Sequence, residues 1–171
     1  MSHHRDRRRA SNLLRRLLPR LPGIEPGATI REATDEEARQ CRADAAIEQP
    51  GQPPLRVAFQ TYSNGTDFTL RTGKHEPWNE LEQVGPGNSC DWYLLDRKAP
   101  VGGKDEHTDA VILDARKMIA AGLFTSAQSA KWHDHASYRN THFHSIGLRK
   151  LHDDGFFVLS LKHKTGKAWY H

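Results

Sequence analysis

The chain has 171 residues, of which 36% are hydrophobic and 27% are charged, and its formal net charge is +4. This length and this share of apolar residues allow one compact core and exclude a second large one. No apolar run is long enough to cross a bilayer, which excludes a membrane-spanning protein and leads us to expect a cytoplasmic one without a membrane partner.

Positive charge gathers at both ends of the chain. Residues 1–20 hold seven arginines against one acid, Asp6, a net of +6, and residues 131–171 hold seven Lys or Arg against three Asp, a net of +4. A basic segment at each end favours an anionic partner. The charge alone does not identify this partner, so the type of partner must be inferred from the elements that carry the charge.

Residues 1–22 are expected to form a basic amphipathic arm, with a short helix over Arg5–Leu18. Four leucines share one side of this helix, opposite its arginines: Leu13, Leu14, Leu17 and Leu18. Pro19 and Pro22 end the helix. We interpret the arm first as a helix that is loosely attached or docks on the chain's own body. Support of nucleic-acid binding is the second interpretation, and binding to a membrane surface is the third.

Residues 23–54 are expected to hold an acidic helix and a linker. The helix is predicted over Thr34–Ile47, because Thr34 can cap it and Glu37 stands at the third helical position, which is a capping-box pattern. The run Gln49–Pro54 is rich in proline and predicts a stiff turn. Neither segment carries residues that indicate a site.

Residues 55–100 are predicted to form a small β-rich region. A hairpin is expected over Leu55–Thr72, because two strand-like runs flank Asn64-Gly65, a dipeptide that tolerates positive φ in a tight turn. A further strand is expected at Trp92–Leu95. The region has no phosphate loop, nucleophile elbow or dinucleotide motif, so we interpret it as a structural or dimerisation sheet.

Residues 106–171 carry the elements on which the functional prediction depends. They are, in chain order, a helix over Thr108–Ala121, a short helix from Thr125 to about His133, a longer helix from Ser137 to about Asp153, a strand at Phe156–Leu161, a cationic turn at Lys162–Lys167 and a strand at Ala168–Tyr170. An amphipathic stripe predicts the first helix, a capping box opened by Thr125 predicts the second, and Gly155 supplies the left-handed residue that closes the third.

This order of elements resembles the winged helix-turn-helix superfamily of DNA-binding domains. The resemblance implies an α+β fold, in which a winged helix-turn-helix domain of three helices plus a β-hairpin wing follows the small β-rich region and the basic N-terminal arm. It implies a non-enzymatic protein that binds duplex DNA without a cofactor, often as a homodimer. Such proteins act in transcription regulation or in transactions of mobile-element and phage DNA.

In such a domain the helix over residues 138–153 would read the major groove, and the turn over residues 162–167 would clamp phosphates. Counting at 100° per residue turns four residues toward the core: Leu148, Leu151, Gly147 and His144. His144 departs from the apolar residue expected at its position. Ten residues are the candidate DNA contacts: Tyr138, Arg139, Asn140, Thr141, His142, Ser145, Arg149, Lys162, Lys164 and Lys167.

Two other functions compete with DNA binding. The winged fold would serve equally for contacts with other proteins. A metal-dependent nuclease is the third hypothesis, because two HxH pairs occur: His133 with His135, and His142 with His144. On a helix, residues two apart diverge by 200° and cannot share an ion, whereas on a strand they would share one face, so the helical prediction favours no metal. Cys41 and Cys90 form no CxxC pair and are expected to be free thiols.

Overall fold

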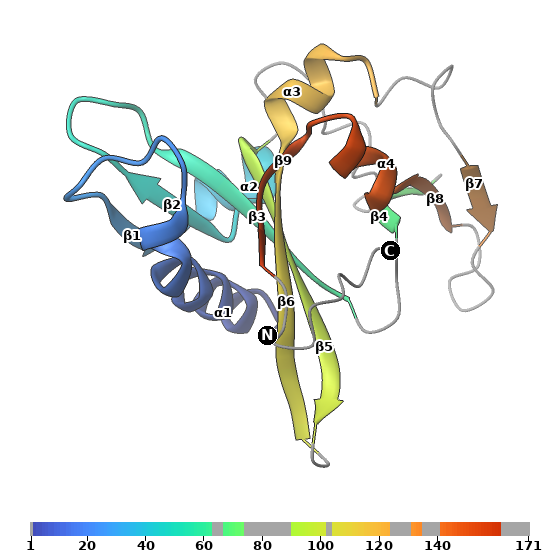
Figure 1. Cartoon of the computed structure of the whole chain (residues 1–171), viewed down its shortest axis with the longest axis horizontal. Helices are drawn as coiled ribbons and strands as arrows, with labels where there is room; N and C mark the ends of the chain where they lie inside the picture. The colour runs from blue at the N-terminus through green and yellow to red at the C-terminus, as the bar shows by residue number, and fades with distance from the viewer. Residues whose placement is uncertain are drawn as a thin grey trace.

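Two β-sheets and the helices packed on them make up the described part of the chain in the computed structural model (Figure 1). The structure describes residues 2–62, 67–73, 90–101, 104–123, 131–134 and 141–161. Its elements are α1 (Ser2–Leu17), η1 (Leu18–Arg20), β1 (Thr29–Glu32), α2 (Asp35–Cys41), β2 (Ala45–Glu48), β3 (Leu55–Tyr62), β4 (Asp67–Gly73), β5 (Trp92–Val101), β6 (Lys104–Asp114), α3 (Ala115–Ala120), β7 (Lys131–Asp134), β8 (Thr141–Gly147), α4 (Leu148–Asp153) and β9 (Phe157–Leu161).

The strands form one larger and one smaller sheet. The larger, sheet A, has six strands in the order β1-β2-β3-β5-β6-β9. Its β3 and β5 run parallel, and its other neighbouring strands are antiparallel. The smaller, sheet B, is antiparallel and has the order β4-β8-β7. The long β5–β6 hairpin links β3 to β9 and lies in the middle of the molecule (Figure 1).

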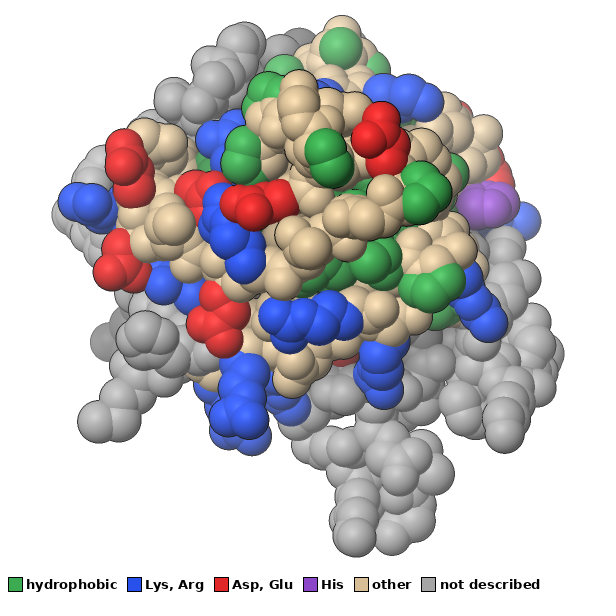
Figure 2. All heavy atoms as spheres, turned by 90° about the vertical axis from the view of Figure 1, so that its left-hand side faces the viewer, with side chains coloured by type: hydrophobic (Ala, Val, Ile, Leu, Met, Phe, Trp, Pro, Cys, Tyr) green, Lys and Arg blue, Asp and Glu red, His purple; other side chains and the backbone are tan. Residues whose placement is uncertain are grey.

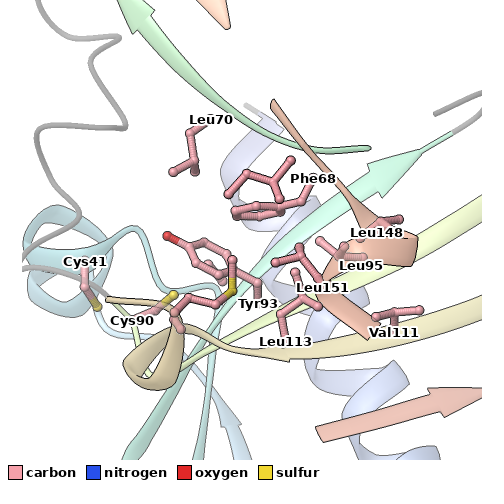
Figure 3. Packing of buried hydrophobic residues seen from close by; sticks show 14 of the residues in the cluster. Cys41, Phe68, Leu70, Cys90, Tyr93, Leu95, Val111, Leu113, Leu148 and Leu151 are labelled. Atoms are coloured by element: carbon pink, nitrogen blue, oxygen red, sulfur yellow. The ribbon is translucent and has the colours of Figure 1, made fainter. Parts of the chain in front are cut away.

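Sheet A is buried on both faces, because alternate residues of its central strands enter two different hydrophobic clusters. In β5, Tyr93 and Leu95 belong to the cluster shared with sheet B, α3 and α4, whereas Leu94 belongs to the cluster that α1 covers. In β6, Val111 and Ile112 divide in the same way. The result is three layers, with α1 on one side of sheet A and sheet B, α3 and α4 on the other (Figure 1). Figure 3 shows the packing of the cluster on the sheet B side.

The winged helix-turn-helix prediction is wrong, because the segments expected to be its helices are largely strands. The helix expected over Thr108–Ala121 is strand β6 in its first half, and only α3 is helical. Residues 110–113 are buried in the middle of sheet A rather than along one side of a helix. A continuous apolar run containing β-branched Val111 and Ile112 suits a strand that is covered on both faces.

The expected recognition helix over residues 138–153 does not form. Within it, the structure places strand β8 and then only the short helix α4, while residues 135–140 lie outside the described part. The short helix expected from Thr125 is strand β7 where the structure describes it, at residues 131–134. As the middle strand of sheet B, β8 pairs with both neighbours, which satisfies its backbone without a helix.

The acidic helix begins as predicted and ends early. Thr34 Oγ1 accepts a hydrogen bond from Glu37 N at 3.2 Å, and the Glu37 carboxylate accepts one from Thr34 N at 2.8 Å, which forms the predicted capping box. Arg42 then takes a left-handed φ of 57°, and residues 45–48 form β2 instead of continuing the helix. The hairpin predicted over Leu55–Thr72 is wrong in its pairing, because β3 belongs to sheet A and β4 to sheet B. The turn expected between them lies outside the described residues.

Several predictions from local sequence are confirmed. The arm is helical, and the strand expected before the cationic turn is β9. Leu148 and Leu151 are buried as predicted, although in α4 rather than in a recognition helix, and Gly155 follows α4 with a φ of 83°. The thiols of Cys41 and Cys90 are free. No helix in the described ranges is long and apolar enough to cross a membrane.

Truncating Leu14 to alanine should destabilise the fold, because this fully buried side chain lies in the cluster between α1 and sheet A. A buried leucine-to-alanine change costs about 2–5 kcal/mol through lost apolar contacts and the cavity left behind. Urea denaturation followed by circular dichroism should show this loss. The exposed Arg16→Ala control on the same helix should change stability by less than about 0.5 kcal/mol. Equal stability of the two variants would mean that α1 does not pack on the sheet in solution.

Candidate nucleic-acid interface

The packing of α1 determines which of its side chains face solvent. Its apolar side contributes four buried residues to the cluster beneath it: Ala10, Leu13, Leu14 and Leu17. These share the cluster with residues of β1, β2 and β3, among them Ile30, Ile47 and Val57. Because helix positions repeat every 3.6 residues, burial of this side turns the opposite side outward. The arm is therefore self-docked, as its first interpretation predicted.

The outward side of α1 is made of arginines, and we call it the arginine face: Arg5, Arg8, Arg9, Arg15 and Arg16. At 100° per residue, these five and Asn12 fall within an arc of about 120°, opposite Ala10 and Leu14. All six are exposed except Arg9, which is half-buried. Arg20, exposed in η1, follows the helix. Figure 2 shows Lys and Arg side chains gathered in the lower part of this side of the molecule.

Polar contacts hold α1 along its length. Arg7, on the side of the helix that carries Leu14 rather than on the arginine face, pairs with Asp35 of α2, with 2.8 Å between Nη1 and Oδ1. Nearer the other end, Arg15 donates from Nη2 to the carbonyl oxygen of Ile30 in β1 at 3.1 Å, and from Nη1 to Oδ1 of Asn12 at 3.0 Å. Together with the buried leucines, these contacts fix the rotation of the helix about its axis.

Three members of the arginine face are open to a ligand. Arg5, Arg8 and Arg16 are exposed, and no acidic side chain of the described residues forms an ion pair with them. The one acid of the helix, Asp6, lies outside the arc of the arginines. From Arg5 to Arg16 the row is about 16 Å long. Planar guanidinium groups match the geometry of phosphate oxygens, so the row can bind a linear chain of phosphates.

Carboxylates on the neighbouring elements are neutralised within the protein. Arg31 of β1 donates from Nη1 to Glu37 Oε2 at 2.8 Å and from Nε to Glu48 Oε1 at 2.6 Å. The hydrogen bond from Arg31 lowers the pKa of Glu37 to about 2, with help from Thr34. Because Arg31 bridges both carboxylates, the acidic residues near α1 compete less for its arginines than their number suggests.

One half-buried carboxylate is influenced by charges in the first turns of α1. Asp44 accepts a hydrogen bond from Phe59 N at 2.9 Å, and burial raises the pKa of Asp44 to about 6. Asp6 adds to this rise, whereas the Phe59 amide and the charges of Arg7 and Arg42 oppose it. Because Asp6 and Arg7 belong to α1, the charge state of Asp44 is linked to the docking of this helix.

Replacing Asp44 by asparagine should stabilise the protein at neutral and basic pH. The folded pKa of about 6 lies above the ordinary value of 3.8, so the stabilisation from protonated Asp44 is complete below the ordinary value and is lost as pH rises through about 6. Above that range the desolvated charge costs on the order of 3 kcal/mol, and asparagine avoids this cost while keeping an acceptor for Phe59 N.

Thermal unfolding of both proteins at about pH 8 and about pH 4.5 checks this expectation. The variant should have the higher Tm at the upper pH, and the difference should shrink at the lower pH. A wild-type protein that matches or exceeds the variant at the upper pH would mean that charged Asp44 is well tolerated in the fold.

The structure does not bring the ten predicted DNA contacts together on one helix. Six of them lie outside the described residues: Tyr138, Arg139, Asn140, Lys162, Lys164 and Lys167. Thr141 and His142 lie in β8 instead. Ser145 is buried in the same strand, so its predicted contact with DNA is wrong. Arg149 is exposed, on the six-residue helix α4 rather than on a recognition helix.

Sequence reasoning placed the DNA contacts in the C-terminal part and left the arm a supporting role. The signal that it passed over is the spacing of the arginines, which recur three and four residues apart and stand opposite the leucines. Such spacing predicts a charged row on one side of a helix as soon as the leucines are assigned to a core.

Comparison with protein-family models found no match, and neither did comparison with curated proteins or with solved structures. The geometry alone therefore bears on function: a row of arginines that is fixed in orientation, exposed except at Arg9, and free of acids within its arc.

Proposed function

We propose that this protein binds duplex DNA through the arginine face of α1, by contacts to phosphates rather than to base edges. The observation that carries this proposal is the division of α1 into a buried leucine side and an exposed arginine side. Arginine contacts to phosphate supply affinity and register but carry no sequence information. The protein would therefore handle DNA without a strong sequence preference.

The chemistry of the arginine face favours a duplex over a single strand. Proteins that bind single strands combine positive charge with aromatic side chains on which the bases stack. The helix α1 contains no Phe, Tyr or Trp, and its exposed arc consists of arginines and Asn12. A surface of this kind suits the regularly spaced phosphates of a double helix. Non-specific contact of this type fits a part in the replication or packaging of mobile-element DNA better than operator recognition by a transcription regulator.

Two alternatives from the sequence compete with DNA binding, and the structure disfavours the first. Binding to a membrane surface through α1 would need its leucines, which are buried against sheet A. A protein-interaction role remains the rival, because an acidic protein surface could occupy the same arginines. The two are distinguished by the dependence of binding on salt, since release of condensed counterions is a property of nucleic acids.

Removing three arginines of the face should weaken DNA binding and flatten its salt dependence. In the triple variant Arg5→Ala, Arg8→Ala and Arg16→Ala, the slope of log K against log salt should shrink by roughly 2.7, since each lost phosphate contact removes about 0.9. Fluorescence anisotropy of a labelled random-sequence duplex across a salt series measures this slope. Circular dichroism should show an unchanged fold, because these three side chains are exposed.

A matched control removes the same charge elsewhere. The triple variant Arg39→Ala, Lys117→Ala and Arg149→Ala takes three exposed cations from α2, α3 and α4. It should keep the wild-type slope, and it includes Arg149, a predicted major-groove contact that is exposed in the structure. Equal losses in both triple variants would point to net charge rather than to the arginine face. A loss in the control alone would place the site on α2, α3 or α4 instead of α1.

A further inference from the structure

The chain has two cysteines, and the fold brings both into one hydrophobic cluster. Cys41 is the last residue of α2, and Cys90 lies just before β5. Their side chains are buried, and both thiols are reduced. Figure 3 shows them next to each other at one edge of the cluster on the sheet B side. Residues that are far apart in the sequence thus place two thiols together in the interior.

The backbone around the two sulfurs also brings them together. The amide of Ala43 lies beside the sulfur of Cys41, and the amide of Ala58 lies beside that of Cys90. Ala43 leads into β2 and Ala58 belongs to β3, and these two strands are hydrogen-bonded neighbours. Each sulfur is therefore held against one of two adjoining backbone segments.

The docked pair is protected from oxidation. Burial raises the pKa of both thiols, and the nearby Cys41 adds to the rise for Cys90. This second effect is electrostatic, so it requires the two sulfurs to be near each other. The thiolate is the form that reacts with oxidants, and burial disfavours it. Reaction of the pair therefore needs a local opening of the structure.

The helix α2 is the element that can open. Cys41 is the one buried residue of its seven. Polar contacts supply much of its attachment, among them the ion pair between Arg7 and Asp35 and the pair between Arg31 and Glu37. A segment with so little buried apolar surface opens at a lower free-energy cost than the centre of sheet A. Opening of α2 exposes the thiol of Cys41 to solvent.

We propose that Cys41 and Cys90 form an intramolecular disulfide when a peroxide oxidises the chain, and that this bond locks α2 onto sheet A. The thiolate of Cys41 in the open helix attacks the peroxide, whose O–O bond breaks, and the products are a sulfenic acid and water. The sulfur of Cys90 then attacks the sulfur of Cys41 as α2 closes. The S–S bond forms, the S–O bond breaks, and the hydroxyl group leaves as water with the proton of Cys90.

The two thiols together lose two electrons and two protons, and hydrogen peroxide becomes two molecules of water. A dithiol reverses the reaction by thiol–disulfide exchange. The bond joins residues on either side of β2, β3 and β4, so it closes a long loop and restricts the unfolded chain. The oxidised protein should therefore resist unfolding better than the reduced one. This lock does not depend on DNA binding by α1.

The first experiment treats the full chain with hydrogen peroxide and then alkylates it under denaturing conditions. The reduced protein should take up two labels and the oxidised protein none, with an intact mass lower by two hydrogen atoms and no covalent dimer. Dithiothreitol should restore both labels. The oxidised form should have the higher Tm, and Cys41→Ser and Cys90→Ser should show no such rise after the same treatment.

The second experiment tests whether α2 controls the reaction. Thr34→Ala removes the acceptor of the capping box of α2, and it should speed disulfide formation about fivefold by favouring the open helix. Asp114→Ala is the matched control, because it removes the side chain that accepts from Lys117 N at the start of α3. It also removes a cap, yet it should leave the rate of disulfide formation unchanged.

Two labels after peroxide treatment, or sulfinic acid at Cys41 without a disulfide, would overturn the proposal. A disulfide that joins two chains, or an oxidised form with a lower Tm than the reduced form, would overturn it as well. Equal acceleration by Thr34→Ala and Asp114→Ala would show that global unfolding, rather than opening of α2, exposes the thiols. Circular dichroism of each reduced variant checks that it folds, and the wild-type labelling result decides the outcome if a variant does not.

Discussion

Burial of both faces of sheet A is the constraint on which the rest of the structure depends. The strands β5 and β6 send alternate side chains, such as Leu94 and Leu95, into two separate hydrophobic clusters, so neither face can be left to solvent. Sheet B, α3 and α4 cover one face, and the leucine side of α1 covers part of the other. The arginine face follows from this arrangement, because the side of α1 that does not cover the sheet is the side that carries the charge.

On the proposed function, the helix α1 thereby links stability to binding. Its arginines repel one another, and this repulsion is offset by the buried leucines and by the ion pair between Arg7 and Asp35. A bound polyphosphate would relieve the repulsion and stabilise the docked helix, since a ligand that binds only the folded state adds to its stability. The raised pKa of Asp44 also involves α1, because a charged Asp44 is desolvated and is repelled by Asp6 of this helix, which destabilises the docked state. Salt and pH therefore both act on the docking of α1, and on the proposed function DNA would act on it too.

Features that depend on a few neighbouring residues could be predicted from the sequence, and features that depend on distant partners could not. The capping box of Thr34 and Glu37, the closing Gly155 and the leucine side of α1 are local, and all three are present. The run at residues 110–113 fits one side of a helix and a central strand equally well by its spacing. Only its pairing with β5 and β9 decides between them, and these partners are not marked in its own sequence.

The C-terminal histidines show how much depends on whether a segment is a helix or a strand. Read as helical, His142 and His144 point to different sides and exclude a shared ion; in strand β8 they share a face with Asp134. The identity of the residues is the same in both cases, and the secondary structure alone removes the geometric objection to a shared ion. The arginine face is less sensitive to such errors, because a helix over the arm is common to the prediction and the structure.

The most direct test of binding through α1 is to map which arginines duplex DNA protects from an arginine-specific dicarbonyl reagent, with mass spectrometry as the readout. The structure predicts protection of Arg5, Arg8 and Arg16, while Arg39 and Arg149 are modified equally with and without DNA. Equal modification of the α1 arginines in both samples, or protection at Arg149 in their place, would contradict the assignment of the arginine face.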